Sequence, residues 1–139
     1  MFRNVLAVVV GIVVAVILIL IVETAGHAVY PPPGNLQLAD RDAMSAYIDA
    51  VPTGALLFVM GAWLAGTLGG GVLACFIAKD RPHVYAGAVG GTVLLGTAIT
   101  LIRIPHPTWF SAISVSAIIL TACLAGRIGR KFVQARNDA

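Results

Sequence analysis

The stretch VLAVVVGIVVAVILILIV, residues 5–22, decides the fold class of this chain. It contains no charged residue, and as an α-helix it would reach roughly 27 Å, close to the thickness of the hydrocarbon core of a bilayer. Three further stretches share these properties: residues 54–78, 84–102 and 109–126. We therefore expect four membrane-spanning segments.

The composition agrees with a membrane protein. Hydrophobic residues make up 59% of the 139 residues and charged residues 11%, whereas a soluble domain is about one quarter charged. Within a bilayer the backbone must satisfy its own hydrogen bonds, which leaves helices or a closed barrel. The runs are continuously apolar, and barrel strands would alternate. The sequence thus predicts an all-α, integral membrane four-helix bundle, a single membrane domain over residues 1–139 with an external loop at 23–53.

The basic residues predict the orientation of the chain. Seven of them fall on one side of a four-span topology: Arg3, Lys79, Arg81, Arg127, Arg130, Lys131 and Arg136. Only Arg41 and Arg103 fall on the other side. Because basic residues favour the cytoplasmic side, we expect both termini there. Cations so few and so dispersed also speak against nucleic-acid binding.

Small residues recur at four-residue intervals within the spans. The glycines that we assign to helix packing are Gly11, Gly66, Gly70, Gly87 and Gly91. Such residues allow helix backbones to approach closely in a membrane. We expect contacts within the bundle. The alternative is a face for a second copy, to which the span at 54–78 would contribute most.

The external loop carries the other predicted elements. Residues 31–34, PPPG, predict a short polyproline segment that ends in a turn. Asp40 can then cap a short helix with one apolar face, formed by Met44, Tyr47, Ile48 and Val51. This helix would either lie flat in the membrane interface or pack on the bundle. An aromatic belt at the same boundary would include Tyr30, Trp109 and Phe110.

Ionisable residues beside the spans gather at one predicted membrane surface. This candidate external polar cluster consists of Glu23, His27, Asp49, Arg103 and His106. If the first span continues past residue 22 as a helix, two of its members share a face, because Glu23 and His27 are four residues apart.

Three hypotheses explain this cluster. In the structural one, which we favour, Glu23 pairs with Arg103 and the histidines bond loop carbonyls. In the second, His27 and His106 bind a metal such as zinc together with Glu23 or Asp49. In the third, a histidine acts as a base while Arg103 holds a lipid phosphate. We assign no catalytic residue, no metal site and no cofactor.

The stretches ETAGHAVYPPPG (residues 23–34) and PHPTWF (residues 105–110) resemble an uncharacterised family of small bacterial four-span inner-membrane proteins. The likeness extends over nearly the whole chain as a pattern of spans and loops. It implies the four-helix topology and a multi-pass location in the cytoplasmic membrane. It implies no activity.

These observations favour a non-enzymatic membrane protein, either an accessory or scaffold protein or an oligomeric interaction subunit. Its partners would be the lipid bilayer together with further copies of itself or another membrane protein. Transporters usually place an ionisable group or a broken helix near the middle of the membrane, and these spans contain neither. The alternatives are an externally facing enzyme that depends on a metal or a lipid head group and, third, a small oligomeric transporter.

Overall fold

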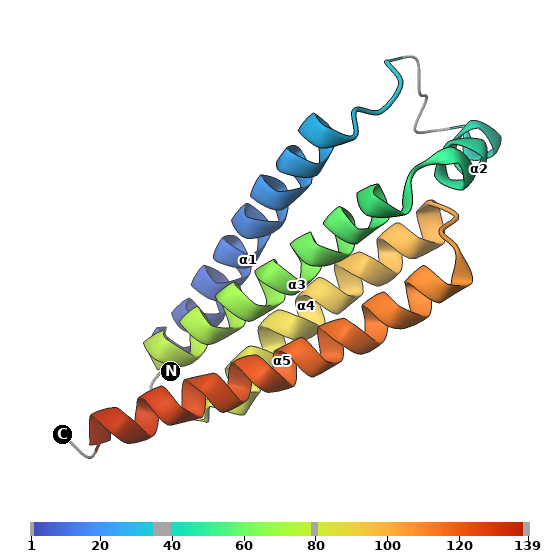
Figure 1. The fold of residues 1–139 in the computed structure, drawn as a ribbon. Helices are drawn as coiled ribbons and strands as arrows, with labels where there is room; N and C mark the ends of the chain where they lie inside the picture. The colour runs from blue at the N-terminus through green and yellow to red at the C-terminus, as the bar shows by residue number, and fades with distance from the viewer. Residues whose placement is uncertain (1, 35–39, 79–80, 138–139) are drawn as a thin grey trace.

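The computed structural model describes residues 2–34, 40–78 and 81–137. These residues form five helices and no strand (Figure 1): α1 (Phe2–Val29), α2 (Arg41–Ala50), α3 (Thr53–Ala78), α4 (Pro82–Arg103) and α5 (Thr108–Asn137). All but α2 are long and apolar enough to cross a membrane. The predicted all-α architecture is confirmed, and it indicates a multi-pass membrane protein.

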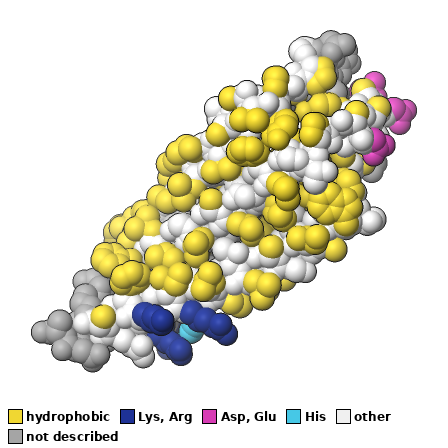
Figure 2. Space-filling model, viewed as in Figure 1, with side chains coloured by type: hydrophobic (Ala, Val, Ile, Leu, Met, Phe, Trp, Pro, Cys, Tyr) yellow, Lys and Arg dark blue, Asp and Glu magenta, His cyan; other side chains and the backbone are white. Residues whose placement is uncertain are grey.

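The four long helices run side by side along one direction (Figure 1). The start of α1, the end of α3, the start of α4 and the end of α5 lie at one end of the bundle, which we call the terminal end. At the other end, the α2 end, lie α2 and the turn at 104–107 between α4 and α5. Figure 2 shows apolar side chains along the length of the visible face, with Lys and Arg at the terminal end and acidic side chains at the α2 end.

Two helices extend beyond the charge-free stretches. Helix α1 continues to Val29, which places Glu23 and His27 one turn apart on the same helix, as the spacing predicts. Helix α5 continues to Asn137, eleven residues past the predicted span (126 to 137). Arg, Lys, Gln and Ala in that extension favour the helix, and positive charge is favourable near a helix C-terminus. The ring of Phe132 in the extension also contacts that of Phe76 in α3, with centroids 6.4 Å apart.

Helix α1 packs mainly on α3, and glycines lie where the two backbones meet. A Cβ atom at Gly11 would lie 2.8 Å from the carbonyl oxygen of Gly70, and one at Gly66 would lie 2.7 Å from that of Ala15. No side chain fits at such distances without a shift of the helices. Close contact between α1 and α3 therefore depends on these glycines.

Two of the glycines assigned to packing have a different environment. Gly87 and Gly91 lie on an exposed face of α4, and a Cβ atom added at either would have no neighbour within 4 Å. The expected contact within the bundle is therefore wrong for these two positions. The four-residue spacing identifies small residues that share one face of a helix. It does not say whether that face contacts another helix.

At the terminal end, a side chain from α1 caps the C-terminus of α3. The Nη2 atom of Arg3 donates a hydrogen bond to the carbonyl oxygen of Ala78, 3.1 Å away. The last carbonyls of a helix have no partner within it, so a cation there satisfies a hydrogen bond and the helix dipole together. Pro82 then begins α4, after Arg81 in a left-handed conformation with φ 37°.

Candidate functional site

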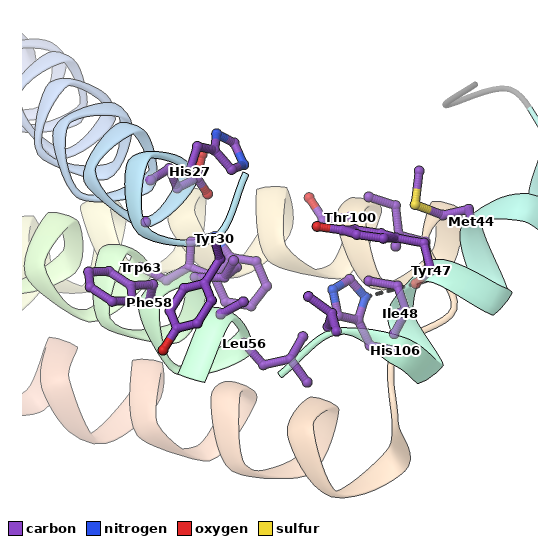
Figure 3. Close-up of a pocket in the computed structure, with 16 residues that line it drawn as sticks. His27, Tyr30, Met44, Tyr47, Ile48, Leu56, Phe58, Trp63, Thr100 and His106 are labelled. Atoms are coloured by element: carbon purple, nitrogen blue, oxygen red, sulfur yellow. Dashed lines mark hydrogen bonds between the residues drawn. The ribbon is translucent and has the colours of Figure 1, made fainter. Parts of the chain in front are cut away.

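A cavity of about 350 Å³ lies at the α2 end of the bundle (Figure 3). We call it the end cavity. Side chains from four helices and the turn at 104–107 line it, among them Glu23, His27, Tyr30, Tyr47, Ile48, Leu56, Trp63, Thr100 and His106. Its volume is within the usual range for small-molecule sites. Most of its wall is apolar, with a few polar groups facing the space.

Helix α2 contributes one wall of the end cavity. Its first turn is fixed by Asp40, whose carboxylate accepts hydrogen bonds from the backbone N–H groups of Asp42 and Ala43 at 3.0 and 3.1 Å. The predicted cap is thus confirmed. Met44 and Ile48, on the predicted apolar face, are buried and line the cavity. This face is therefore turned toward the bundle, which agrees with the second of the two alternatives for α2.

His106 is held in one orientation by two contacts. Its Nδ1 atom lies 2.9 Å from the carbonyl oxygen of Ile104, and because a carbonyl only accepts, Nδ1 carries the hydrogen. The ring stacks on that of Phe110, with centroids 5.0 Å apart and planes 17° apart. The contacts of the described residues leave Nε2 as a free acceptor. Burial lowers the pKa of His106 and so favours the neutral imidazole, and the hydrogen bond to Ile104 opposes this shift.

Aromatic rings pack against one another next to His106. Phe110 is fully buried, and its ring lies 5.7 Å from that of Trp63. The prediction that Phe110 belongs to an aromatic belt facing the membrane boundary is therefore wrong, because its ring packs between α3 and the turn. Trp109 is exposed, and Tyr30 packs edge-on against Phe58 with centroids 6.0 Å apart.

The structure brings together three of the five residues in the predicted polar cluster. Glu23 is half-buried, and it lines the end cavity together with His27 and His106. Asp49 and Arg103 are exposed and do not line it. Among the residues that the structure describes, no ion pair joins Glu23 to Arg103, so that part of the structural hypothesis is wrong. The part in which a histidine bonds a loop carbonyl is correct for His106.

The metal hypothesis requires three ligand side chains at one point. Within residues 2–34, 40–78 and 81–137 the structure has no group of three His, Cys, Asp or Glu side chains that could hold a metal ion. Glu23, His27 and His106 share a cavity wall without converging on one centre. The arrangement instead offers separate hydrogen-bonding groups in an apolar space.

Sequence reasoning missed several residues of the site. Tyr47, Trp63 and Thr100 line the end cavity, yet none of them belongs to the candidate cluster that the sequence suggested. A signal did exist for Thr100, since Thr97 and Thr100 repeat at a helical spacing within an otherwise apolar span.

Comparison with known proteins adds no constraint on this site. No family model matches the chain, and neither a curated protein nor a solved structure was found to be similar to it.

Proposed function

We propose that this protein is a non-enzymatic accessory protein of the bacterial cytoplasmic membrane that binds a small amphiphilic molecule in the end cavity. The observation that carries the proposal is the composition of the cavity wall. Its lining is mainly aliphatic and aromatic, with a carboxyl group from Glu23 and an imidazole from His106 among a few polar groups. Ligand sites typically combine an apolar wall with a few placed polar groups in this way.

The proposed topology places both termini in the cytoplasm and the end cavity at the external membrane boundary. The support is the distribution of charge along the bundle. Exposed cations of α5, Arg127, Arg130 and Lys131, follow its span near the terminal end, where the Lys and Arg of Figure 2 gather. Basic residues favour the cytoplasmic side. Helix α2 would then sit at the external interface, with its apolar face against the bundle.

Binding is preferred to catalysis for two reasons. The described residues contain no cluster that could hold a metal, and Arg103, the cation that the head-group hypothesis assigned to a lipid phosphate, does not line the cavity. His106 could accept a proton at Nε2, but no nucleophile is paired with it in the described part of the chain. A transporter ranks lower still, because each of the four long helices is continuous. A homo-oligomer or a membrane-protein partner remains compatible with the proposed role.

A variant that fills the end cavity tests the proposal. Ala55 lines the cavity, and Ala55→Phe places a ring in its space. Ala88→Phe is the matched control, because Ala88 is exposed on α4 and lines no part of the cavity. Each protein is extracted in mild detergent and examined by native mass spectrometry. We expect a retained small molecule, one per chain, on the parent protein and on Ala88→Phe, and its loss from Ala55→Phe.

The same measurement can contradict the proposal. If the parent protein retains no small molecule and takes up none from added lipid extract, the end cavity is not a binding site. Equal retention by Ala55→Phe and Ala88→Phe would place the bound molecule elsewhere on the protein.

A further inference from the structure

A second cavity continues from the first along the side of the bundle. It lies between α1 and α4, has a volume of about 350 Å³, and we call it the side slot. On α1 its wall runs from Glu23 to Ile12, a length of roughly 16 Å along the helix. Val16 of α1 and Gly96 of α4, which also line it, are exposed. The side slot therefore opens toward the surroundings of the apolar helices, which in a membrane are lipid chains.

The end cavity and the side slot meet at three residues. Glu23, Trp63 and Thr100 line both of them. Two mainly apolar spaces thus adjoin at the carboxyl group of Glu23 and the hydroxyl group of Thr100. This arrangement matches a molecule with a polar head and one hydrocarbon chain.

A buried hydroxyl group in the side slot lacks a partner. Thr97 is 2% exposed, and its Oγ1 atom has no hydrogen-bond partner among the described residues. A buried polar atom without a partner costs free energy unless something else satisfies it. A hydrocarbon chain cannot satisfy this hydroxyl group, but Thr97 lies about one turn of α4 from Thr100, so a hydrogen-bonding head group at the junction of the cavities would be placed to do so.

Three polar groups along this path can accept hydrogen bonds, in addition to the donors that His27, Tyr30 and Tyr47 bring to the end cavity. Thr100 donates its own hydrogen to the carbonyl oxygen of Gly96 at 3.0 Å, which leaves its oxygen free to accept. His106 accepts at Nε2 because its hydrogen is on Nδ1. Glu23 is a carboxyl group without a hydrogen bond or an ion pair within the described part of the chain. No Lys or Arg side chain lines either cavity.

We infer that the end cavity and the side slot together bind a single-chain amphiphile whose head carries a primary ammonium group. The ammonium pairs with Glu23, where the two cavities meet, and the hydrocarbon chain lies in the side slot between α1 and α4. An ammonium supplies N–H donors to these acceptors and a positive charge to the carboxyl group of Glu23, which no Lys or Arg side chain of the lining provides. An anionic head would be repelled by the carboxylate of Glu23 at the junction of the cavities. The inference rests on the proposed function, since it names the ligand class of the same site.

The experiment uses Trp63 as a reporter. The chain has two tryptophans, so Trp109→Phe leaves Trp63 as the only one, at the junction of the cavities. This protein is placed in nanodiscs at neutral pH and titrated with dodecylamine, dodecyltrimethylammonium, 1-dodecanol and dodecanoate. We expect dodecylamine to bind about tenfold more tightly than 1-dodecanol, as a charge-assisted hydrogen bond predicts. The quaternary and anionic probes should bind no better than the alcohol.

Two variants separate the head site from the chain site. Glu23→Gln should remove the preference for the amine while binding of 1-dodecanol persists. Gly96→Phe should weaken binding of both, because it fills the side slot. The matched control is Gly91→Phe on the same helix. Both glycines are exposed with no atom within 4 Å of an added Cβ, but only Gly96 lines the slot.

The outcomes separate this inference from the proposed function. Equal affinity for the amine and the alcohol, or an unchanged preference in Glu23→Gln, would overturn the ammonium assignment and leave the binding role intact. Equal effects of Gly96→Phe and Gly91→Phe would overturn the placement of the chain in the side slot. If no probe binds the parent protein, both the inference and the proposed function are wrong.

Discussion

Helix α1 meets its neighbours in two different ways along its length. Toward the terminal end, Gly11 lies so close to Gly70 of α3 that neither position could carry a side chain without a shift. Toward the α2 end, a large side chain of α3 lies against α1: a Cβ atom added at Gly26 would lie 3.0 Å from the Cβ atom and 3.2 Å from the nearest ring atom of Phe58. Figure 1 shows α1 and α3 diverging in this direction. The comparison teaches how a cavity can form in a helical bundle: small residues allow two helices to pack closely at one end, and aromatic side chains keep the same helices apart at the other end.

The largest expected effect concerns the closed part of this contact. Gly70→Ala places a methyl group against the carbonyl oxygen of Gly11, so it should lower the free energy of unfolding by about 3 kcal/mol. Gly91→Ala is the control, because its methyl group meets no atom, and it should change stability by less than about 0.5 kcal/mol. Unfolding in mixed micelles by added SDS measures both. Similar values for the two variants would show that α1 and α3 do not depend on close backbone contact.

A smaller effect of opposite sign is expected on the open side. Thr97→Val removes the unpartnered hydroxyl group and should raise the free energy of unfolding of the ligand-free protein by about 1 kcal/mol. Thr67 is equally buried, but its hydroxyl donates to the carbonyl oxygen of Trp63 at 2.7 Å. Thr67→Val should therefore lower stability by about 1 kcal/mol. The same SDS titration distinguishes them, and a loss of stability in Thr97→Val would mean that its hydroxyl has a partner after all.

The terminal end offers a further test of how α1 is attached. Arg3→Met removes the hydrogen bond to Ala78 and should cost about 0.5–1 kcal/mol. Arg127→Met removes an exposed cation near the same end and should have less effect. Thermal unfolding in detergent compares the two. If Arg127→Met proves as damaging as Arg3→Met, the effect belongs to the net charge of this end and not to the bond that joins α1 to α3.

The smallest expected effect is a dependence on pH at the α2 end. Burial lowers the pKa of His106 in the folded protein below the 6.5 of an exposed histidine, so the unfolded chain binds a proton first. The contribution of the His106 ring to the free energy of unfolding is fully present above pH 6.5. It is lost as the pH falls from 6.5 toward the lowered pKa of the folded protein. His106→Gln cannot titrate at this position. Thermal unfolding should therefore show a shallower loss of stability on acidification for the variant, and parallel curves would argue that the ring is solvated.

The spans could be predicted from the sequence because the bilayer imposes their length and composition. The same local rules gave the cap at Asp40 and the shared face of Glu23 and His27. The lengths of α1 and α5 were underestimated, because a charged residue ends an apolar run without ending a helix. Arg127 and its successors continue α5 beyond the membrane.

The neighbours of each helix face could not be predicted in the same way. A four-residue spacing marks one face of a helix, yet nothing local says whether another helix or lipid covers it, and Gly87 and Gly91 turned out to be exposed. For the same reason Arg103 was paired with Glu23, although its position on α4 directs it away from the cavity. Thr97 escaped notice because threonines within spans commonly bond their own helix, as Thr100 does, and only the three-dimensional structure shows that its hydroxyl is free.

The most direct test of the account follows the hydrocarbon chain itself. Trp63 is buried, so bromine atoms on lipid chains outside the bundle reach it poorly, whereas a chain in the side slot passes beside it. In the Trp109→Phe protein, a long-chain amine brominated along its chain should quench Trp63 fluorescence saturably. We predict that Gly96→Phe abolishes this quenching and that Gly91→Phe preserves it. Quenching that rises without saturation, and to the same extent in both variants, would contradict the account.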